Sequence, residues 1–177
     1  MNVENIEIKT ERLVLRELKK DDITKKYIQG LNDKEITRFT EARYKKWDFE
    51  SIKKYVENSI KDDYSLLLGI FFQNKHIGNI HLIIFNKIHK RCDLGIIVFD
   101  KTLWNKGIAY EALSSMTDYY IKSNILHKIC ADYNELNHNS AKLFKKCGFE
   151  NEGKFIDHIL FEGKFVNSIR VAKISDE

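Results

Sequence analysis

The segment that most directly suggests chemistry is the loop around Gly107, which follows an apolar run over residues 94–99 and opens onto a helix-like pattern. Amide groups at the start of a helix have no intrahelical partner, and the helix dipole makes that end positive, so it binds anions. Gly107 and Ala109 are small enough for the backbone to approach phosphate oxygens closely. The pattern therefore indicates a pyrophosphate-binding loop.

Two familiar phosphate-binding motifs do not fit this loop. The dinucleotide fingerprint needs three spaced glycines, and only Gly107 is present; in a P-loop the lysine follows the glycine, whereas Lys106 precedes it. The loop instead resembles the acetyl-CoA loop of the GNAT acetyltransferase superfamily, written [QR]-x-x-G-x-[GA]. Gly107 and Ala109 match that pattern, and Trp104 replaces the usual Gln or Arg.

The resemblance is closer to one branch of that superfamily, which holds the ribosomal-protein N-terminal acetyltransferases and the spermidine acetyltransferases. A Trp-Gly-Lys-Gly form of the loop is common there, and Asn105 takes the place of its first glycine. A second segment, Asn137-x-x-Ser140 followed by a short helix and Gly148-Phe149, is similar to the second CoA-contacting element of the family. Ser140 is predicted to be the N-cap or a first-turn residue of that helix.

The resemblance implies how acetyl-CoA would be held. Backbone amides of Ile97, Val98 and Phe99 would face the acetyl-pantetheine arm, and Asn137 would hydrogen-bond that arm. Amides of the Gly107 region would hold the pyrophosphate, with the charge of Lys106 nearby. The predicted cofactor-binding residues are Ile97, Val98, Phe99, Trp104, Asn105, Lys106, Gly107, Ile108, Ala109, Asn137 and Ser140.

The catalytic groups are predicted less directly. Many GNAT enzymes have a tyrosine acid where Phe144 stands, and phenylalanine cannot donate a proton. In the ribosomal-protein branch the serine of N-x-x-S stabilises the leaving thiolate, which implies this role for Ser140; the alternative is a plain helix cap. Asp93 could accept the proton of the amine, directly or through water, or it could form a salt bridge with Arg91 or another neighbour. A chain of water molecules without a single base also stays open.

The acceptor is expected between the two N-terminal helices and the C-terminal hairpin. Predicted substrate-binding residues are Asn32, Arg38, His81 and His158. For His81, which lies in an apolar run, the alternative is a half-buried, hydrogen-bonded side chain. Acceptors compatible with the polar stretch 32–43 are a peptide amino group, a nucleotide-linked amino sugar and a polyamine. The stretch carries two arginines beside its glutamates, which slightly disfavours the polyamine.

Composition agrees with a cytoplasmic enzyme. The 177 residues predict a single domain over 1–177, and 43% hydrophobic content excludes a disordered chain. No apolar run reaches the roughly 20 residues of a membrane span, and the first residues resemble no signal peptide. Three separated cysteines (Cys92, Cys130, Cys147) form neither a zinc spacing nor a disulfide framework, and no metal is expected. A net charge of +4 suits CoA without requiring nucleic acid, and homodimers are common in the family.

Hydrophobic periodicity predicts the order βααβββαβαββ. The expected elements are a strand near 13–16, helices 23–31 and 49–60, strands 64–72, 76–85 and 93–99, a helix over 108–122, a strand 128–133, a helix 140–147, and a hairpin of strands 150–161 and 164–174. Asp21 and Asp22 are predicted to cap the first helix. The buried side of the second is predicted to carry Ile52, Tyr55, Val56 and Ile60.

This order predicts an α/β fold with a mixed sheet and helices on both faces. Four strands would form an antiparallel meander before the Gly107 loop. Strands 93–99 and 128–133 would be parallel neighbours across a right-handed crossover. The resemblance implies the GNAT fold, a mostly antiparallel central sheet in which this parallel pair splays apart to admit the pantetheine arm.

The sequence thus predicts an acetyl-CoA-dependent N-acetyltransferase that transfers the acetyl group directly to a primary amine in a ternary complex. No cysteine is placed to form an acyl-enzyme. One alternative is the same chemistry on a nucleotide-linked amino sugar or a polyamine. Another is a CoA-binding domain without turnover, which the phenylalanine at position 144 motivates.

Overall fold

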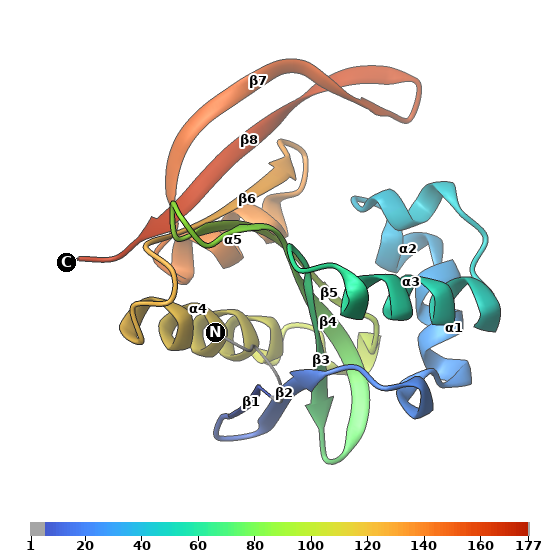
Figure 1. The fold of residues 1–177 in the computed structure, drawn as a ribbon. Coiled ribbons are helices and arrows are strands. Elements are labelled where there is room, and N and C mark those ends of the chain that lie inside the picture. The colour runs from blue at the N-terminus through green and yellow to red at the C-terminus, as the bar shows by residue number, and fades with distance from the viewer. Residues whose placement is uncertain (1–5, 177) are drawn as a thin grey trace.

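A computed structural model describes residues 6–176 of the chain, apart from the side chains of residues 84 and 85. The predicted absence of a signal peptide concerns residues 1–5, which lie outside the described part. Eight strands form one sheet in the order β1-β2-β3-β4-β5-β6-β8-β7 (Figure 1). Their bounds are β1 (Glu7–Lys9), β2 (Leu13–Glu17), β3 (Leu66–Phe72), β4 (Lys75–Asn86), β5 (Arg91–Val98), β6 (Lys128–Asn134), β7 (Glu150–Phe161) and β8 (Lys164–Ile174).

Neighbouring strands are antiparallel throughout, with one exception. The strands β5 and β6 are parallel, and their register covers three pairs, from Arg91 opposite Lys128 to Asp93 opposite Cys130. Beyond these pairs β5 continues beside β4, while β6 continues beside β8. The two strands therefore part after Asp93, which confirms the predicted mixed sheet and leaves a gap between them.

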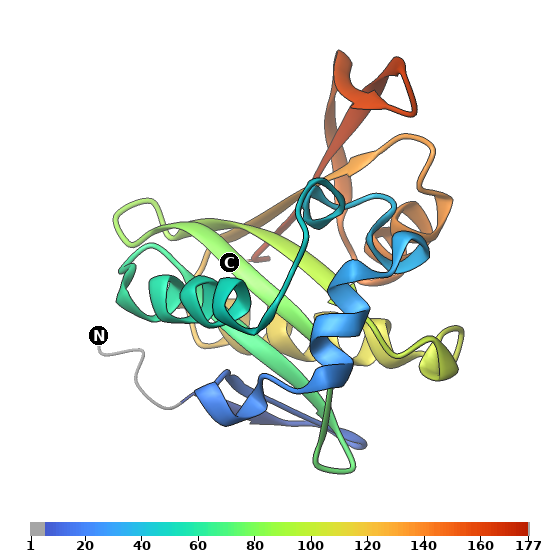
Figure 2. The same cartoon turned by 90° about the vertical axis from the view of Figure 1, so that its right-hand side faces the viewer.

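Helices cover both faces of the sheet, as predicted. They are α1 (Lys25–Asn32), α2 (Lys34–Thr37), α3 (Phe49–Lys61), α4 (Ile108–Lys122) and α5 (His138–Lys146), with short 3-10 helices η1 (Lys20–Asp22), η2 (Glu41–Tyr44) and η3 (Lys101–Leu103). The helices α4 and α5 bury Leu113, Met116 and Phe144 against one face. On the other face, α1 and α3 bury Tyr27 and Ile52 (Figures 1 and 2).

Most predicted elements are confirmed, and α4, β7 and β8 have the expected bounds. A short strand, β1, was not predicted, so five strands rather than four precede the Gly107 loop. The first helix starts at Lys25, and its N-cap is Thr24, whose hydroxyl accepts a hydrogen bond from the amide of Tyr27 (3.2 Å). Asp21 and Asp22 form η1 instead of the cap.

Two further details of the helices differ from the prediction. Ile60 was expected on the buried side of α3 but is 62% exposed, because the buried stripe of the helix runs through Ile52, Val56 and Ser59 and Ile60 lies one residue beyond it around the helix. Helix α5 begins at His138, two residues before the predicted start, with Asn137 as its N-cap.

Candidate active site

The gap between β5 and β6 has an inner edge formed by the backbone of β5. The amide of Phe99 donates to the carbonyl of Ile77 in β4 (2.9 Å). Backbone groups alternate sides along a strand, so the amide of Ile97 also faces β4 and that of Val98 faces the gap. The amide of Phe99 is therefore already engaged within the sheet, and of the three predicted amides only that of Val98 is directed to the open side.

Trp104 closes the end of this edge. Its indole nitrogen donates to the carbonyl of Val98 (2.9 Å), the last residue of β5, which pairs with Gly78 of β4. The side chain at this position is therefore used to fix the end of β5.

The Gly107 loop, which we define as residues 104–109, winds into the N-terminus of α4. Asn105 (φ +59°) and Gly107 (φ +78°) are both left-handed, and Gly107 is the N-cap. The first intrahelical hydrogen bond runs from the amide of Glu111 to the carbonyl of Gly107 (2.9 Å). The amides of Ile108, Ala109 and Tyr110 precede that bond and have no partner within residues 6–176. The loop thus offers three amides at the positive end of a helix dipole.

Arg12, which the sequence analysis missed, lies at this helix end. A guanidinium nitrogen of Arg12 would be 3.4 Å from a Cβ added to Gly107, and another donates to the carbonyl of Lys106 (3.0 Å). Glu111 holds Arg12 through its Nε (2.7 Å) and amide (2.8 Å), and also accepts from the hydroxyl of Thr10 (2.5 Å). Almost 100 residues separate Arg12 from Glu111, so no local motif could have revealed the contact.

A second set of ion pairs ties the loop to the N-terminal helices. Asp100, directly before η3, pairs with Lys26 of α1. Lys101 pairs with Asp33 (2.8 Å) and Glu35 (2.6 Å) at the start of α2. The segment between β5 and α4 is therefore held from both sides, by β1–β2 through Arg12 and by α1–α2 through these pairs.

Helix α5 faces the gap from the β6 side. The side-chain oxygen of Asn137 accepts from the amide of Ser140 (3.1 Å), so Asn137 is the cap and the cap interpretation of Ser140 is wrong. The hydroxyl of Ser140, a first-turn residue, has no partner in the described part of the chain, and the amide nitrogen of Asn137 has none either. Phe144 is buried and stacks with Tyr133 (ring centroids 5.9 Å apart), so it is a core residue.

Asp93 lies at the closed end of the gap. One oxygen of its carboxylate accepts from Arg170 (2.5 Å), and Arg170 also pairs with Asp132 (2.6 Å). Burial lowers the pKa of Arg170, but hydrogen bonds to both carboxylates outweigh burial and raise it. The salt-bridge partner of Asp93 is therefore Arg170, from β8, rather than Arg91. The second carboxylate oxygen of Asp93 has no partner among the described residues.

Comparison with known proteins agrees with this geometry. The profile of the family described as Acetyltransferase (GNAT) domain matches residues 12–150. The chain belongs to the GNAT acetyltransferase family. It is 26% identical over 157 residues to a spermidine N(1)-acetyltransferase of Vibrio cholerae, covering 87% of this chain and 88% of that protein.

A further relative and a solved structure show similarities of two kinds. A ribosomal protein uS5-alanine N-acetyltransferase of Escherichia coli is 30% identical over 97 residues, which is 54% of this chain and 48% of that protein. The structure of a ribosomal L7/L12 alpha-N-protein acetyltransferase in complex with coenzyme A superposes with a TM-score of 0.87 over 97% of this chain and 99% of that one, at 18% identity. The last similarity shows that the two share the GNAT fold.

The two predicted substrate-binding histidines of this acetyltransferase lie apart. The ring nitrogens of His81 are hydrogen-bonded to the hydroxyls of Tyr55 (2.8 Å) and Ser65 (2.7 Å), and burial lowers its pKa. These contacts match the alternative of a half-buried, hydrogen-bonded side chain. His158 is exposed in an irregular part of β7, beside the ring of Phe155 (5.1 Å).

A cavity of about 530 Å³ lies where the acceptor was expected, between the α1–η2 segment and the tip of the β7–β8 hairpin. Asn32 and Arg38 both line it, as does Arg43, after which we name it the Arg43 pocket. Asn32 also has a structural role, because its amide group exchanges hydrogen bonds with the backbone of Trp47 (2.7 and 2.9 Å). Arg38 pairs with Glu162 at the hairpin tip (3.0 Å).

The cysteines are free and buried, at the positions the sequence analysis noted. Burial raises the pKa of Cys92 to about 12 and that of Cys147 to about 11, and also raises that of Cys130. Thiols held protonated in this way are poor nucleophiles. Within residues 6–176 no group of His, Cys, Asp and Glu side chains could hold a metal ion, and no helix is long and apolar enough to cross a membrane.

Proposed function

We propose that this protein is an N-acetyltransferase that moves the acetyl group of acetyl-CoA directly to a primary amine within a ternary complex. The observation that carries the proposal is the position of the β5–β6 gap beside the N-terminus of α4. The gap offers the amide of Val98 to an extended arm, and the helix offers the amides of Ile108, Ala109 and Tyr110 to a pyrophosphate. An acyl-pantetheine joined to a pyrophosphate needs these two features next to each other.

The residues present fit acetyl-CoA. The pyrophosphate would lie on the α4 amides, with Lys106 and Arg12 adding positive charge. Arg12, directly before β2, would supply the cation that the loop lacks at Trp104. The pantetheine arm would follow β5, where Asn137 keeps its amide nitrogen available to donate to an arm carbonyl.

The chemistry follows from the groups around the gap. A neutral amine attacks the thioester carbon, the resulting tetrahedral intermediate expels the CoA thiolate, and the amine loses one proton. We assign stabilisation of the thiolate to the hydroxyl of Ser140, which no other described residue engages. We assign the amine proton to the unpaired oxygen of Asp93, directly or through water, while Arg170 holds the other oxygen (2.5 Å).

The acceptor we propose first is the amino group of a peptide, as in the ribosomal-protein acetyltransferases. A nucleotide-linked amino sugar and a polyamine are the alternatives; Asn32, Arg38 and His158 are the predicted contacts, whereas both ring nitrogens of His81 are already hydrogen-bonded within the fold. We also propose that residues 1–177 act as one domain, because one sheet runs from β1 to β7. The expected location is the cytoplasm, where acetyl-CoA is available.

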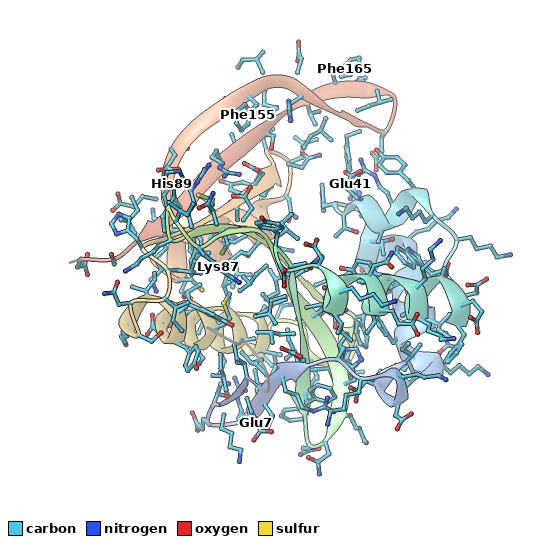
Figure 3. The ribbon with its side chains drawn as sticks, in the orientation of Figure 1. Glu7, Glu41, Lys87, His89, Phe155 and Phe165 are labelled. Carbon is cyan, nitrogen blue, oxygen red and sulfur yellow. The ribbon has the colours of Figure 1, made fainter. Side chains whose placement is uncertain are left out.

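A homodimer is part of the proposal. Phe155 and Phe165 lie on opposite faces of the β7–β8 hairpin (Figure 3), and both are strongly exposed at 45% and 65%. The molar mass in solution, measured by light scattering after gel filtration, distinguishes a dimer from a 20.9 kDa monomer.

The first experiment is a thermal-shift titration with acetyl-CoA, followed by thiol release in the presence of each class of amine. A ligand that binds only the folded state raises the unfolding midpoint. A raised unfolding midpoint, together with release of the CoA thiol in the presence of one amine, supports the transferase. A raised midpoint without thiol release in the presence of any amine would instead favour an acetyl-CoA-binding domain without turnover. Phe144, which cannot donate a proton, motivates this alternative.

A further inference from the structure

The charge of the Arg43 pocket is strongly unbalanced. Five cationic side chains line it, against the single carboxylate of Glu162; they are Lys34, Arg38, Arg43, Lys45 and Lys46. Glu162 is already paired with Arg38 (3.0 Å). The neighbouring Glu41, which Figure 3 shows on η2, is not part of the lining. The cavity therefore has a formal charge of +4, five cations less one carboxylate.

Nearby carboxylates compensate only part of this positive charge: Glu162 pairs with Arg38, and the carboxylate of Asp48 interacts electrostatically with Lys46. Asp33 and Glu35 pair with Lys101, and none of these three residues lines the pocket. Within residues 6–176, no ion pair involves Lys45 or Lys46; the ammonium of Lys45 lies 5.6 Å from the ring centre of Trp47. The positive potential of the pocket is thus left for a ligand to satisfy.

Arg43 is the most fixed of the five. Its guanidinium donates to the carbonyls of Arg38 (2.5 Å) and Leu160 (3.2 Å) and to the hydroxyl of Tyr44 (2.5 Å). All of these partners are neutral, so they orient the group without cancelling its charge. An oriented, uncompensated guanidinium is well suited to bind a carboxylate or phosphate.

The same contacts join the pocket to the fold. The rings of Phe39 and Phe161 stack with centroids 5.1 Å apart, and Arg43 lies 5.1 Å from the centre of the Phe161 ring. This packing fixes the hairpin tip against the α2–η2 segment. The cationic groups therefore line a built cavity between two elements and do not form an isolated surface patch.

We infer that the acceptor is an amine that also carries a carboxylate or phosphate, and that the Arg43 pocket holds this anionic group while the amine reaches the β5–β6 gap. The inference rests on the proposed function. It separates this chain from its spermidine-acetylating relative, because a polyamine would bring further positive charge to a cavity that is already positive.

The inference is tested first by comparing matched acceptors. Thiol release is measured with peptides that share a free N-terminus and differ only in having two Asp, two Asn or two Lys residues after it. An amino sugar linked to a nucleoside diphosphate is compared with the free amino sugar, and spermidine completes the set. We expect kcat/KM to be at least about 10-fold higher for the anionic member of a pair; equal values, or a preference for the Lys peptide or spermidine, overturn the inference.

The two pairs also distinguish the source of the anion. Preference confined to the Asp peptide assigns the pocket to carboxylates of a peptide, and preference confined to the nucleotide sugar assigns it to phosphate. The pocket can also be tested without transfer. If no acceptor of either pair gives thiol release while acetyl-CoA still raises the unfolding midpoint, the equilibrium affinity of each acceptor for the acetyl-CoA complex is measured instead. Tighter binding of the anionic members supports the pocket even where transfer fails, and equal binding overturns it.

Charge removal provides the second test. The variant Lys45→Met with Lys46→Met should raise KM for the anionic acceptor about 10-fold and lower its dependence on salt. Acetyl-CoA binding should not change. The matched control replaces two exposed lysines at the far end of the molecule, Lys20→Met with Lys75→Met, and should leave KM unchanged. Equal increases of KM in both variants would indicate that the positive protein attracts the anionic acceptor nonspecifically, and would overturn the assignment of the Arg43 pocket as its binding site.

Discussion

The Gly107 loop and the Arg43 pocket are built in opposite ways. The loop presents backbone amides, and a few consecutive residues before α4 determine their directions. The pocket presents charged side chains from two segments that are far apart in sequence; the contact of Arg43 with Leu160 spans 117 residues. A site made of backbone is sensitive to conformation and tolerant of side-chain type. A site made of side chains has the reverse sensitivity.

The largest expected effect follows from this difference. Gly107→Glu should abolish acetyl-CoA binding, raising Kd by at least about 100-fold, because a carboxylate would occupy the anion site and a non-glycine residue at φ +78° strains the turn. Isothermal titration with acetyl-CoA measures the effect.

Gly163→Glu is the matched control, because Gly163 is also left-handed (φ +83°) and an added Cβ meets nothing within 4 Å. This variant has the same strain and the same added charge, but in the lining of the Arg43 pocket. It should bind acetyl-CoA normally and bind the anionic acceptor more weakly. Loss of acetyl-CoA binding in both variants, or in neither, would remove the distinction between the two regions.

Asp93 offers the next largest effect. If its carboxylate accepts the amine proton, Asp93→Asn should lower kcat by about 100-fold or more and remove the acidic limb of the profile of kcat/KM against pH. Asp132→Asn is the control, since Asp132 is the other carboxylate bound to Arg170 (2.6 Å). If Asp93→Asn keeps the acidic limb of the pH profile and both variants are only less stable, then Asp93 serves the ion pair with Arg170 and not the proton transfer.

Substitutions of Ser140 and Asn137 distinguish a role in catalysis from a role in helix capping. Ser140→Ala should reduce kcat about 10-fold with little change in Kd for acetyl-CoA, because one hydrogen bond to the leaving thiolate is lost. Its free energy of unfolding should change by less than about 0.5 kcal/mol, since no described residue bonds to the hydroxyl. Asn137→Ala should lower the free energy of unfolding by about 1 kcal/mol, because the N-cap of α5 is lost. Unchanged kcat in Ser140→Ala would exclude the thiolate role.

The same contrast explains what could be predicted from the sequence. Hydrophobic periodicity located most elements, and the spacing around Gly107 located the loop, because both are encoded by neighbouring residues. The polar stretch 32–43 was predicted to contact the acceptor, and two of its members, Asn32 and Arg38, line the Arg43 pocket. Sequence spacing could not show that Val98, and not Ile97 or Phe99, faces the gap, since this depends on which neighbour strand pairs with which side of β5.

Long-range ionic contacts were the main omission. Arg12 reaches Glu111 and Arg170 reaches Asp93 across 99 and 77 residues, respectively. Charged side chains are common on any surface, so nothing in the local pattern distinguishes these partners from solvated ones. Positions of this kind can be found only once the sheet order is known, because the sheet brings β2 beside α4 and β8 beside β6.

The smallest expected effect concerns acid stability, and it tests whether the loop is held more firmly than the pocket. Burial raises the pKa of Glu111, but hydrogen bonds from Thr10 and Arg12 outweigh burial and lower it below the ordinary 4.5. The folded state therefore binds this proton less readily than the unfolded state does. The resulting stability is present above about pH 4.5 and is lost as the pH falls through the lowered pKa.

Glu111→Gln should therefore lower the free energy of unfolding by about 1–2 kcal/mol at pH 7, and its difference from the unsubstituted protein should shrink below pH 4.5. Urea unfolding at several pH values measures both. Glu162→Gln is the comparison from the pocket: its partner Arg38 is 52% exposed and Glu162 is 63% exposed, so the change at pH 7 should stay within about 0.5 kcal/mol. Equal losses in the two variants would mean that the pocket ion pair stabilises the fold as much as the contacts that hold the Gly107 loop.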